Sequence, residues 1–185
     1  FHKTAVSAEQ LLINIFKRCR ELIDQGMELS ASQSLEYFLY KKYLADTPEG
    51  MLAMFYKLDD ADIQVAFKTW AESSDRVLSL LCRNMMERKL YKIELQDSPF
   101  DKDRVDSMKT KMQQKWSFTL DETGYFVFTN SIINKAYSAQ NDNIQILFKN
   151  REIKDISEAS DMLSLPVLSK IVKKYFLCYP KEISI

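Results

Sequence analysis

Positively charged side chains gather where a predicted helix meets a predicted strand. Arg88, Lys89 and Lys92 lie within five consecutive positions, and Arg83 precedes them by about a turn and a half of helix. An arginine binds a phosphate through two parallel N–H···O bonds, and a lysine adds a compact charge. Cations near a helix C-terminus are also stabilised by the helix dipole alone. From these residues alone we therefore favour a simple helix-end charge cluster, with a phosphate-binding site as the alternative.

Few other groups in the chain could perform catalysis. The chain has one histidine, His2, and three glycines, which are too few and too far apart for a Walker loop or a Rossmann glycine pattern. A Ser–His–Asp or Cys–His arrangement would have to use His2. Cys19, Cys82 and Cys178 are far apart and lie in apolar patterns, so we expect buried free thiols in a reducing compartment. We therefore predict no catalytic residue and no metal site in this chain.

Three neighbouring aspartates, Asp59, Asp60 and Asp62, raise the alternative of a metal site. No histidine lies near them in the sequence, and carboxylates at the start of a helix are favoured by capping and by the helix dipole. We therefore interpret them as a helix start. The aromatic residues between positions 38 and 70 follow helix faces and lack interleaved arginine, so we expect a core and not a base-stacking platform. This set comprises Phe38, Tyr40, Tyr43, Phe55, Tyr56, Phe67 and Trp70.

The composition argues against several classes of protein. Of the 185 residues, 46% are hydrophobic, and equal numbers of basic and acidic residues give a formal net charge of zero. A surface built entirely for nucleic acid or anionic membrane would need an excess of positive charge. No apolar run approaches the roughly 20 residues of a membrane-spanning helix. We expect a folded cytoplasmic protein without membrane contact. Because Phe1 stands next to a helical pattern, we also expect a fragment of a longer chain.

Hydrophobic periodicity predicts a helical first half. The clearest helix covers residues 4–24 and ends at Gly26, because glycine readily adopts the left-handed conformation that closes a helix. Its predicted apolar face contains Ala5, Ala8, Leu12, Ile15, Phe16, Cys19, Leu22 and Ile23. Further helices are predicted from Ser34 to Tyr43, from Asp59 or Asp60 to Trp70, from Asp75 to about Lys89 and from Asp101 to about Gln114, with a break in the chain at 46–50.

The second half is richer in β-branched and aromatic residues, which favour strands. Strands are predicted at residues 90–95, 116–119, 125–133, 144–148 and 171–179, with turns at Gly124 and 140–143 and a short helix at 158–165. Short connections favour antiparallel pairing. We therefore predict an α+β fold, with about four to five helices in residues 1–95 and a small, mainly antiparallel sheet with one or two helices in residues 96–185. Strand 90–95 either ends the first half or joins the later sheet, so the halves could pack as one unit.

Four short motifs resemble those of one family. They are His2-Lys3-Thr4, Leu58-Asp59-Asp60-Ala61-Asp62-Ile63, Arg88-Lys89-Leu90-Tyr91-Lys92 and, more weakly, Phe126 and Phe128 followed by Asn134 and Tyr137. Their order resembles the C-terminal half of HD-type dNTP triphosphohydrolases, the family that includes the SAM- and HD-domain enzyme. Two positions depart from the family pattern, since Lys89 replaces an uncharged polar residue and Tyr91 replaces a phenylalanine.

The resemblance implies a role in nucleotide binding and assembly. In the SAM- and HD-domain enzyme the corresponding positions line regulatory nucleotide sites between subunits. The implied phosphate-binding residues here are His2, Lys3, Arg88, Leu90 and Lys92. The implied partners are a dNTP- or GTP-like effector in the assembled parent, the parent's own catalytic domain, and further copies in a homo-oligomer. The apolar face of helix 4–24 would then pack on the catalytic core or on a second subunit.

The implied parent is a bacterial-type enzyme that hydrolyses a dNTP to a deoxynucleoside and triphosphate. Its divalent metal would be held by the His…His-Asp…Asp site of an HD domain, which a chain with one histidine cannot build. We therefore expect the chain alone to be inactive and to act as a regulatory and oligomerisation portion. The alternative is a non-enzymatic domain whose basic junction binds a protein or a nucleic acid.

Overall fold

Helix α1 (Lys3–Asp24) begins and ends where its sequence predicts. The computed structural model describes residues 2–134, 145–155 and 172–183. His2 caps the start of α1, with its Nδ1 accepting a hydrogen bond from the Ala5 amide at 3.4 Å. At the end, Gly26 has a φ of 88°, and the Met27 amide donates to the Leu22 carbonyl at 2.9 Å. This is the left-handed glycine turn that closes many helices, and the predicted helix is confirmed.

The buried face of α1 differs from the predicted one. Leu11 and Ile15 are fully buried, whereas Leu12 is only partly buried. The buried stripe is rotated because α5 (Arg76–Met86) and β1 (Lys92–Gln96) pack against this side of the helix. Elements of this chain therefore cover the buried side of α1, and packing of the predicted face on a catalytic core or a second subunit stays a prediction.

The segment after α1 contains more helical elements than the single helix predicted there. The predicted helix from Ser34 to Tyr43 is in fact α2 (Gln33–Leu39) followed by the 3₁₀ helix η1 (Lys42–Ala45). The predicted break at 46–50 holds the start of helix α3 (Pro48–Phe55). Thr47 caps α3 by accepting a hydrogen bond from the Gly50 amide at 3.1 Å, and Pro48 occupies the first helical turn, where no amide hydrogen is needed.

Helix α4 (Asp60–Trp70) follows the prediction closely, and α5 begins where predicted. Asp59 accepts hydrogen bonds from the first turn of α4, and the Asp62 carboxylate accepts one from the Asp59 amide, which forms a capping box. The interpretation of these aspartates as a helix start is confirmed. Asp75 caps α5 through the Leu78 amide at 2.8 Å. The buried residues of the two helices are Ala66, Phe67, Trp70, Val77, Leu78, Leu81 and Cys82.

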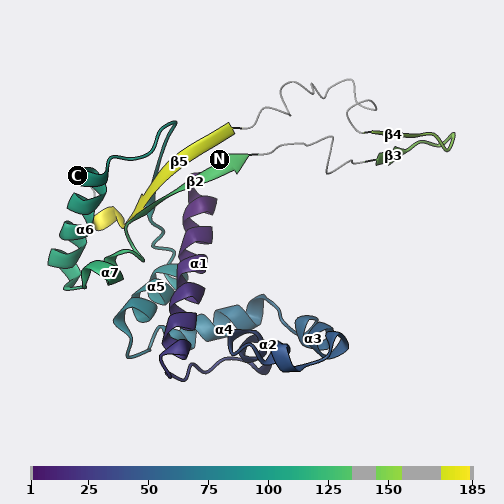
Figure 1. Cartoon of the computed structure of the whole chain (residues 1–185), viewed down its shortest axis with the longest axis horizontal. Helices are drawn as coiled ribbons and strands as arrows, with labels where there is room; N and C mark the ends of the chain where they lie inside the picture. Colours follow the sequence, from purple (N-terminus) through teal and green to yellow (C-terminus); the bar gives the residue numbers. More distant parts are fainter. Residues whose placement is uncertain (1, 135–144, 156–171, 184–185) are drawn as a thin grey trace.

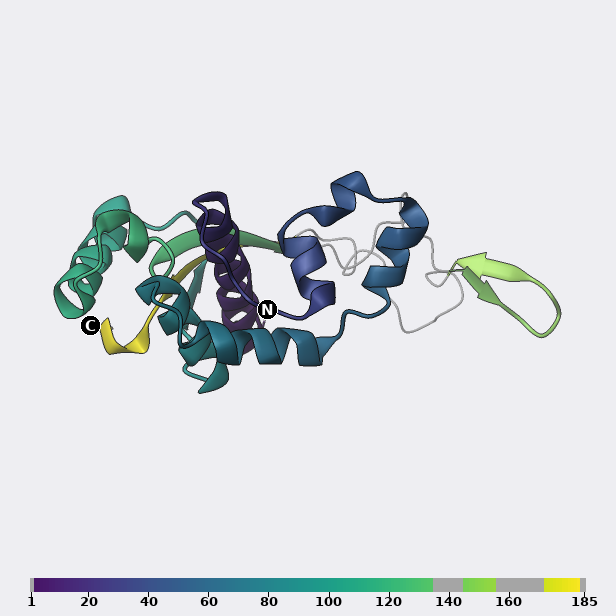
Figure 2. The same ribbon diagram turned by 90° about the horizontal axis from the view of Figure 1, so that it is seen from below.

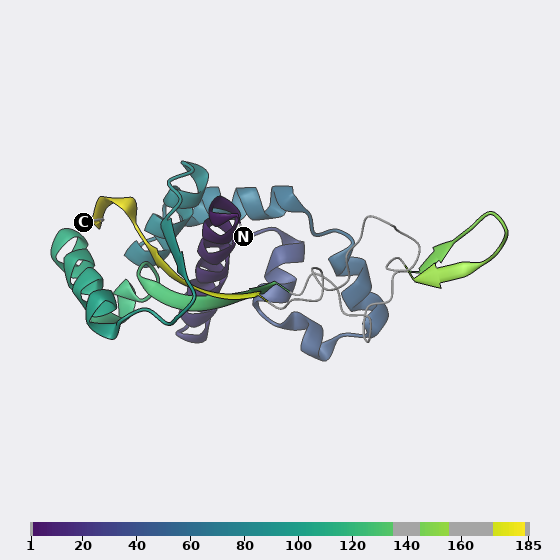
Figure 3. The same ribbon diagram turned by 90° about the horizontal axis from the view of Figure 1, so that it is seen from above.

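An antiparallel sheet joins the two halves of the sequence. β5 (Val172–Tyr179) lies between β1 and β2 (Phe128–Asn134). Lys92 of β1 pairs with Tyr179, and Phe128 of β2 pairs with Cys178. A separate hairpin pairs β3 (Gln145–Leu147) with β4 (Ile153–Asp155), a strand that was not predicted. The α+β class and the antiparallel pairing are confirmed, and β1 joins the later sheet (Figure 3).

Two helices precede β2. Helix α6 (Lys102–Trp116) follows Asp101 as predicted, but it runs two residues further, to Trp116, and the Asp101 side chain makes no cap hydrogen bond. The strand predicted at 116–119 is wrong. Ser117 is left-handed with a φ of 55°, and Thr119 caps the short helix α7 (Leu120–Thr123) in a capping box with Glu122. The 3₁₀ helix η2 (Lys181–Ile183) follows β5 and is the last element that the structure describes. The helix predicted at 158–165, the turn at 140–143 and Tyr137 lie outside the described residues.

The helices and the sheet meet around α1. Figures 1 and 2 show α2, α3 and α4 near the C-terminal end of α1, with α6 and α7 beyond the sheet. Aromatic rings join α1 to α4, because the Phe16 centroid lies 6.2 Å from that of Phe67 and 6.1 Å from that of Trp70. The indole N–H of Trp70 donates to the Ser30 carbonyl at 2.9 Å, which fixes the chain between α1 and α2.

A largely buried ion pair ties α1 to the start of α5. The Arg18 guanidinium donates to both Asp75 carboxylate oxygens, at 3.0 and 2.6 Å, and the two side chains are 14% and 11% exposed. Burial acts to raise the pKa of Asp75, but the hydrogen bonds from Arg18 and from the Leu78 amide outweigh it and hold the pKa below its usual value. The same ion pair raises the pKa of Arg18.

We expect Asp75→Asn to lower the free energy of unfolding by about 2 kcal/mol at neutral pH, because it leaves a largely buried guanidinium without its countercharge. The native state lowers the Asp75 pKa, so the pair contributes fully above the unfolded value of about 3.9 and loses its contribution as pH falls through the native value. Urea unfolding between neutral and acidic pH should therefore show the difference between wild type and Asp75→Asn shrinking below about pH 4.

Glu72→Gln is the matched control, because the Glu72–Arg83 pair is exposed. Its effect on stability should be much smaller and nearly independent of pH. Equal losses for the two variants would contradict the structural role of the Arg18–Asp75 pair.

Candidate phosphate-binding site

Arg88 lies at a left-handed turn that ends α5. Its φ is 56°, Glu87 is the C-cap, and the Lys89 amide donates to the Asn84 carbonyl at 2.8 Å. The Arg88 amide also donates to the Met85 carbonyl at 3.3 Å. These two bonds form the helix-closing motif that usually places glycine where Arg88 stands. The helix therefore ends at Met86, earlier than predicted, and the turn directs the chain into β1.

The Arg88 side chain lines a cavity of about 410 Å³ between α4 and α5. Gln64 and Lys68 of α4 line the same cavity, and its apolar wall consists of Phe67, Met85 and Met86. Lys68 and Gln64 were not among the predicted site residues. Lys68 precedes the basic cluster that begins at Arg83 by more than a dozen residues in the sequence. Only the packing of α4 against α5 brings Lys68 close to Arg88.

The basic cluster predicted from the sequence is divided in the structure. Lys89 pairs with Glu87 at 2.6 Å, which lowers the pKa of the Glu87 carboxyl. Arg83 donates to the Ala71 carbonyl at 3.0 Å and pairs with Glu72 at 3.5 Å. Neither Arg88 nor Lys68 has an ion pair with any residue that the structure describes. The positive charges of Arg88 and Lys68 therefore remain available to bind an anion at this end of α5.

Lys92 belongs to a second cluster on the sheet. Its ammonium lies 5.6 Å from the centroid of the Tyr179 ring. The Tyr179 hydroxyl donates to the Glu94 carboxylate, and Arg104 donates to the same carboxylate at 2.6 Å. Burial opposes ionisation of Glu94, but these hydrogen bonds hold its pKa below the usual value. Lys92 is not among the described residues that line the cavity beside Arg88.

The other predicted site residues, His2, Lys3 and Leu90, lie at a helix start or against the core. His2 and Lys3 are exposed at the start of α1, where His2 serves as the cap. Leu90 is partly buried against the core. The neighbouring Tyr91 is buried, and its hydroxyl accepts a hydrogen bond from the Asn84 amide at 3.3 Å. Burial raises the pKa of this hydroxyl. Neither His2 nor Lys3 is among the described residues that line the cavity beside Arg88.

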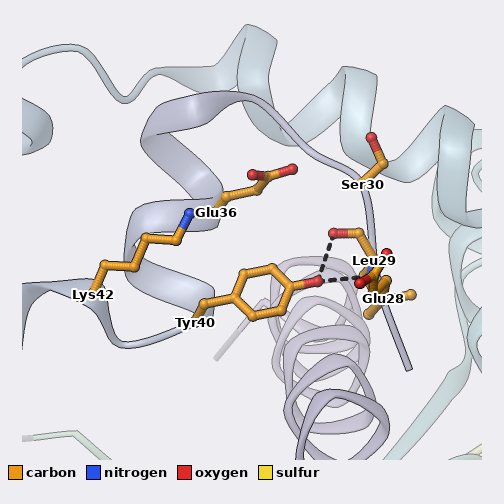
Figure 4. A pocket seen from close by; sticks show the side chains of 6 residues that line it. All are labelled: Glu28, Leu29, Ser30, Glu36, Tyr40 and Lys42. Carbon is orange, nitrogen blue, oxygen red and sulfur yellow. Dashed lines mark hydrogen bonds between the residues drawn. The ribbon is translucent and has the colours of Figure 1, made fainter. Parts of the chain in front are cut away.

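A larger cavity, of about 620 Å³, lies between the end of α1 and α2 (Figure 4). The Tyr40 hydroxyl accepts from the Leu29 amide at 2.8 Å and donates to the Leu29 carbonyl at 3.0 Å. Glu36 accepts from the Ala31 amide at 3.1 Å. These polar groups are occupied in holding the loop after α1 against α2. We therefore interpret this cavity as part of the scaffold.

Four further features of the described residues concern metal binding, free thiols, membrane spans and exposed apolar side chains. Residues 2–134, 145–155 and 172–183 contain no group of three or more His, Cys, Asp or Glu arranged to hold a metal ion. Cys19, Cys82 and Cys178 are buried free thiols. The helices of the described segments are too short or too polar to cross a membrane. Large apolar side chains are exposed around α3, namely Leu44, Met51, Leu52, Phe55 and Tyr56.

The chain is similar to a phosphohydrolase from Bacteroides thetaiotaomicron VPI-5482 whose crystal structure is known. The two are 42% identical, the match covers 98% of this chain and 46% of that chain, and the TM-score is 0.77. The uncharacterized protein YwfO of Bacillus subtilis (strain 168) is 24% identical over 192 residues, which cover 99% of this chain and 41% of YwfO. No protein-family model matches the chain. The chain thus shares sequence and fold with part of a phosphohydrolase and spans less than half the length of these two proteins.

We expect Arg88→Gly to raise the free energy of unfolding by about 0.5–1 kcal/mol, because glycine adopts the left-handed conformation without the cost of a Cβ. Lys89→Gly is the control, since Lys89 is not left-handed and glycine there only adds freedom to the unfolded chain. Thermal and urea unfolding would measure both. If Arg88→Gly lowers the free energy of unfolding as much as Lys89→Gly does, the left-handed turn at Arg88 is not strained.

Proposed function

We propose that this chain is the C-terminal regulatory and oligomerisation portion of an HD-type, metal-dependent phosphohydrolase. The parent enzyme hydrolyses a dNTP to a deoxynucleoside and triphosphate. The observation that carries the proposal is the 42% identity to a phosphohydrolase over 98% of this chain. The motifs His2-Lys3, Leu58 to Ile63 and Arg88 to Lys92 support the finer assignment to the dNTP triphosphohydrolases.

In the proposed parent, the HD portion carries out hydrolysis and this chain binds the nucleotide phosphates. A divalent metal bound in the HD portion would supply the activated water for hydrolysis. The residues present here do not fit that metal site, because His2 is the only histidine and caps α1. This chain instead contributes cations for nucleotide phosphates: Arg88 and Lys92, with His2 and Lys3 at the start of α1. Three buried free thiols are consistent with a reducing compartment such as the cytoplasm.

Assembly in the proposed parent uses apolar surface that this chain leaves exposed. Phe55 is 58% and Tyr56 is 78% exposed at the end of α3. Monomeric proteins rarely expose large contiguous apolar patches, and such patches often mark protein interfaces. The same surface would favour the second candidate function, a non-enzymatic interaction domain. The two functions differ in whether nucleotide controls assembly of the parent.

The chain by itself should release no triphosphate from any dNTP in the presence of magnesium or manganese. It has one histidine, and the family's metal centre requires several. Incubation with each dNTP, followed by separation of nucleoside and triphosphate, would measure this against a reaction without protein. Product formation that scales with the concentration of the purified chain would contradict the assignment of chemistry to another portion.

In the full-length parent, Arg88→Ala and Lys92→Ala should each weaken activation by nucleotide. A charged hydrogen bond contributes about 1.5–3 kcal/mol, so the activating concentration should rise by roughly ten- to a hundredfold. Hydrolysis rates and sedimentation across an effector titration would follow activity and assembly together. Lys102→Ala, an exposed lysine at the start of α6, is the control. Unchanged activation curves for both Arg88→Ala and Lys92→Ala would refute the regulatory role of this chain.

A further inference from the structure

Two exposed apolar surfaces lie on different parts of the chain. The first, which we call the α3 surface, consists of Met51, Leu52, Phe55 and Tyr56. The second, the hairpin surface, consists of Leu147 and Ile153, which are cross-strand partners on one face of the β3–β4 hairpin. Figures 1 and 2 show the hairpin apart from α3. Removing apolar surface from water is favourable, so both surfaces are suited to contact with a protein partner.

Acidic side chains border the α3 surface. Glu49 is exposed in the first turn of α3 and precedes Leu52 by three positions, so the two residues lie on the same side of the helix. Asp60 is exposed at the start of α4, four positions after Tyr56. From position 41 to position 62 the chain has five acidic and three basic residues. The segment that carries the α3 surface therefore has a net negative charge.

Basic side chains border the hairpin surface. Lys149 and Arg151 are exposed in the turn between β3 and β4, and the Arg151 amide closes this turn by donating to the Phe148 carbonyl at 2.9 Å. Lys154 of β4 pairs with Glu152 at 3.1 Å. Neither Lys149 nor Arg151 has an ion pair with a residue that the structure describes. The charge beside the hairpin surface is therefore opposite to the charge beside the α3 surface.

We propose that the hairpin surface of one copy of this chain packs on the α3 surface of a second copy. Each copy has both surfaces, so two copies can exchange their hairpins reciprocally and close a symmetric dimer. The apolar side chains supply affinity, and the opposite charges beside them fix the orientation of the two copies. A two-stranded hairpin is marginally stable alone, so the contact also stabilises β3 and β4. This proposal rests on the proposed function and deepens its oligomerisation role, because it names the two surfaces that meet.

Sedimentation of single and mixed variants of the 185-residue chain tests the contact. The wild-type chain should show a concentration-dependent equilibrium between monomer and dimer. Leu147→Asp and Phe55→Asp should each weaken dimerisation by about tenfold or more, because each places a charge in an apolar contact. An equimolar mixture of the two variants should associate more tightly than either alone, because the intact hairpin of one meets the intact α3 surface of the other. Leu120→Asp on α7 is the matched control, since Leu120 and Phe55 are both 58% exposed, and it should leave dimerisation unchanged.

Exchanged charges test the orientation of the two copies. Arg151→Glu and Glu49→Lys should each weaken dimerisation, because each places like charges beside the contact. A mixture of these two variants should recover it, because opposite charges again face each other at both contacts. Without recovery, the charge pairing is overturned. Thermal unfolding of every variant checks that the exposed substitutions leave the fold intact.

The possible results separate this inference from the proposed function. Dimerisation of Leu147→Asp like wild type would show that the hairpin takes no part, and the same result for Phe55→Asp would exclude the α3 surface. A mixture of the two that associates no better than either variant would overturn the pairing of hairpin with α3. A wild-type chain that stays monomeric up to roughly millimolar concentration would overturn the second copy as the partner. The proposed function would still be decided by nucleotide activation of the full-length parent.

Discussion

The contact between Arg18 and Asp75 fixes α1 against the start of α5. Asp75 caps α5 and at the same time accepts two hydrogen bonds from Arg18, so one carboxylate both starts α5 and fixes it against α1. The guanidinium also lies 5.6 Å from the centroid of Tyr125, just before β2. The Tyr125 hydroxyl donates to Glu21 of α1, and burial together with this carboxylate raises its pKa to about 12. The network thus links α1, α5 and the entry to the sheet.

The position of the candidate site follows from that network. Once α5 is fixed at Asp75, its length determines where Met86 ends the helix and where Arg88 turns the chain toward β1. The buried Tyr91 and the pairing of β1 with β5 then hold the chain beyond the turn. A side chain on such a turn is exposed, while its backbone is fixed on both sides. This combination of a rigid backbone and an accessible cation is what a binding residue needs.

Similarity to part of a longer phosphohydrolase is consistent with the surfaces of the chain. Helix α3 exposes Phe55 and Tyr56, and the β3–β4 hairpin exposes Leu147 and Ile153. Cross-strand neighbours Leu147 and Ile153 lie on one face of the hairpin. A two-stranded hairpin is marginally stable in isolation, so this face is expected to gain stability from a partner. Among the described residues, α3 and the hairpin are therefore two places where large apolar side chains are exposed close together.

The sequence by itself determined the local features, because they depend on residues within one turn of each other. The sequence correctly predicts the helix start at Asp59, the end of α1 at Gly26 and the cap at Asp75. The capping box formed by Thr119 and Glu122 is also a local signal, but the high strand propensity of residues 116–119 favoured the wrong structure there. Only the tertiary structure decided which side of α1 is buried, since that depends on where α5 and β1 pack. It also brought Lys68 to the same cavity as Arg88, a cavity that Lys92 does not line. Spacing along a chain cannot reveal such a pairing, because the contact is made between two helices.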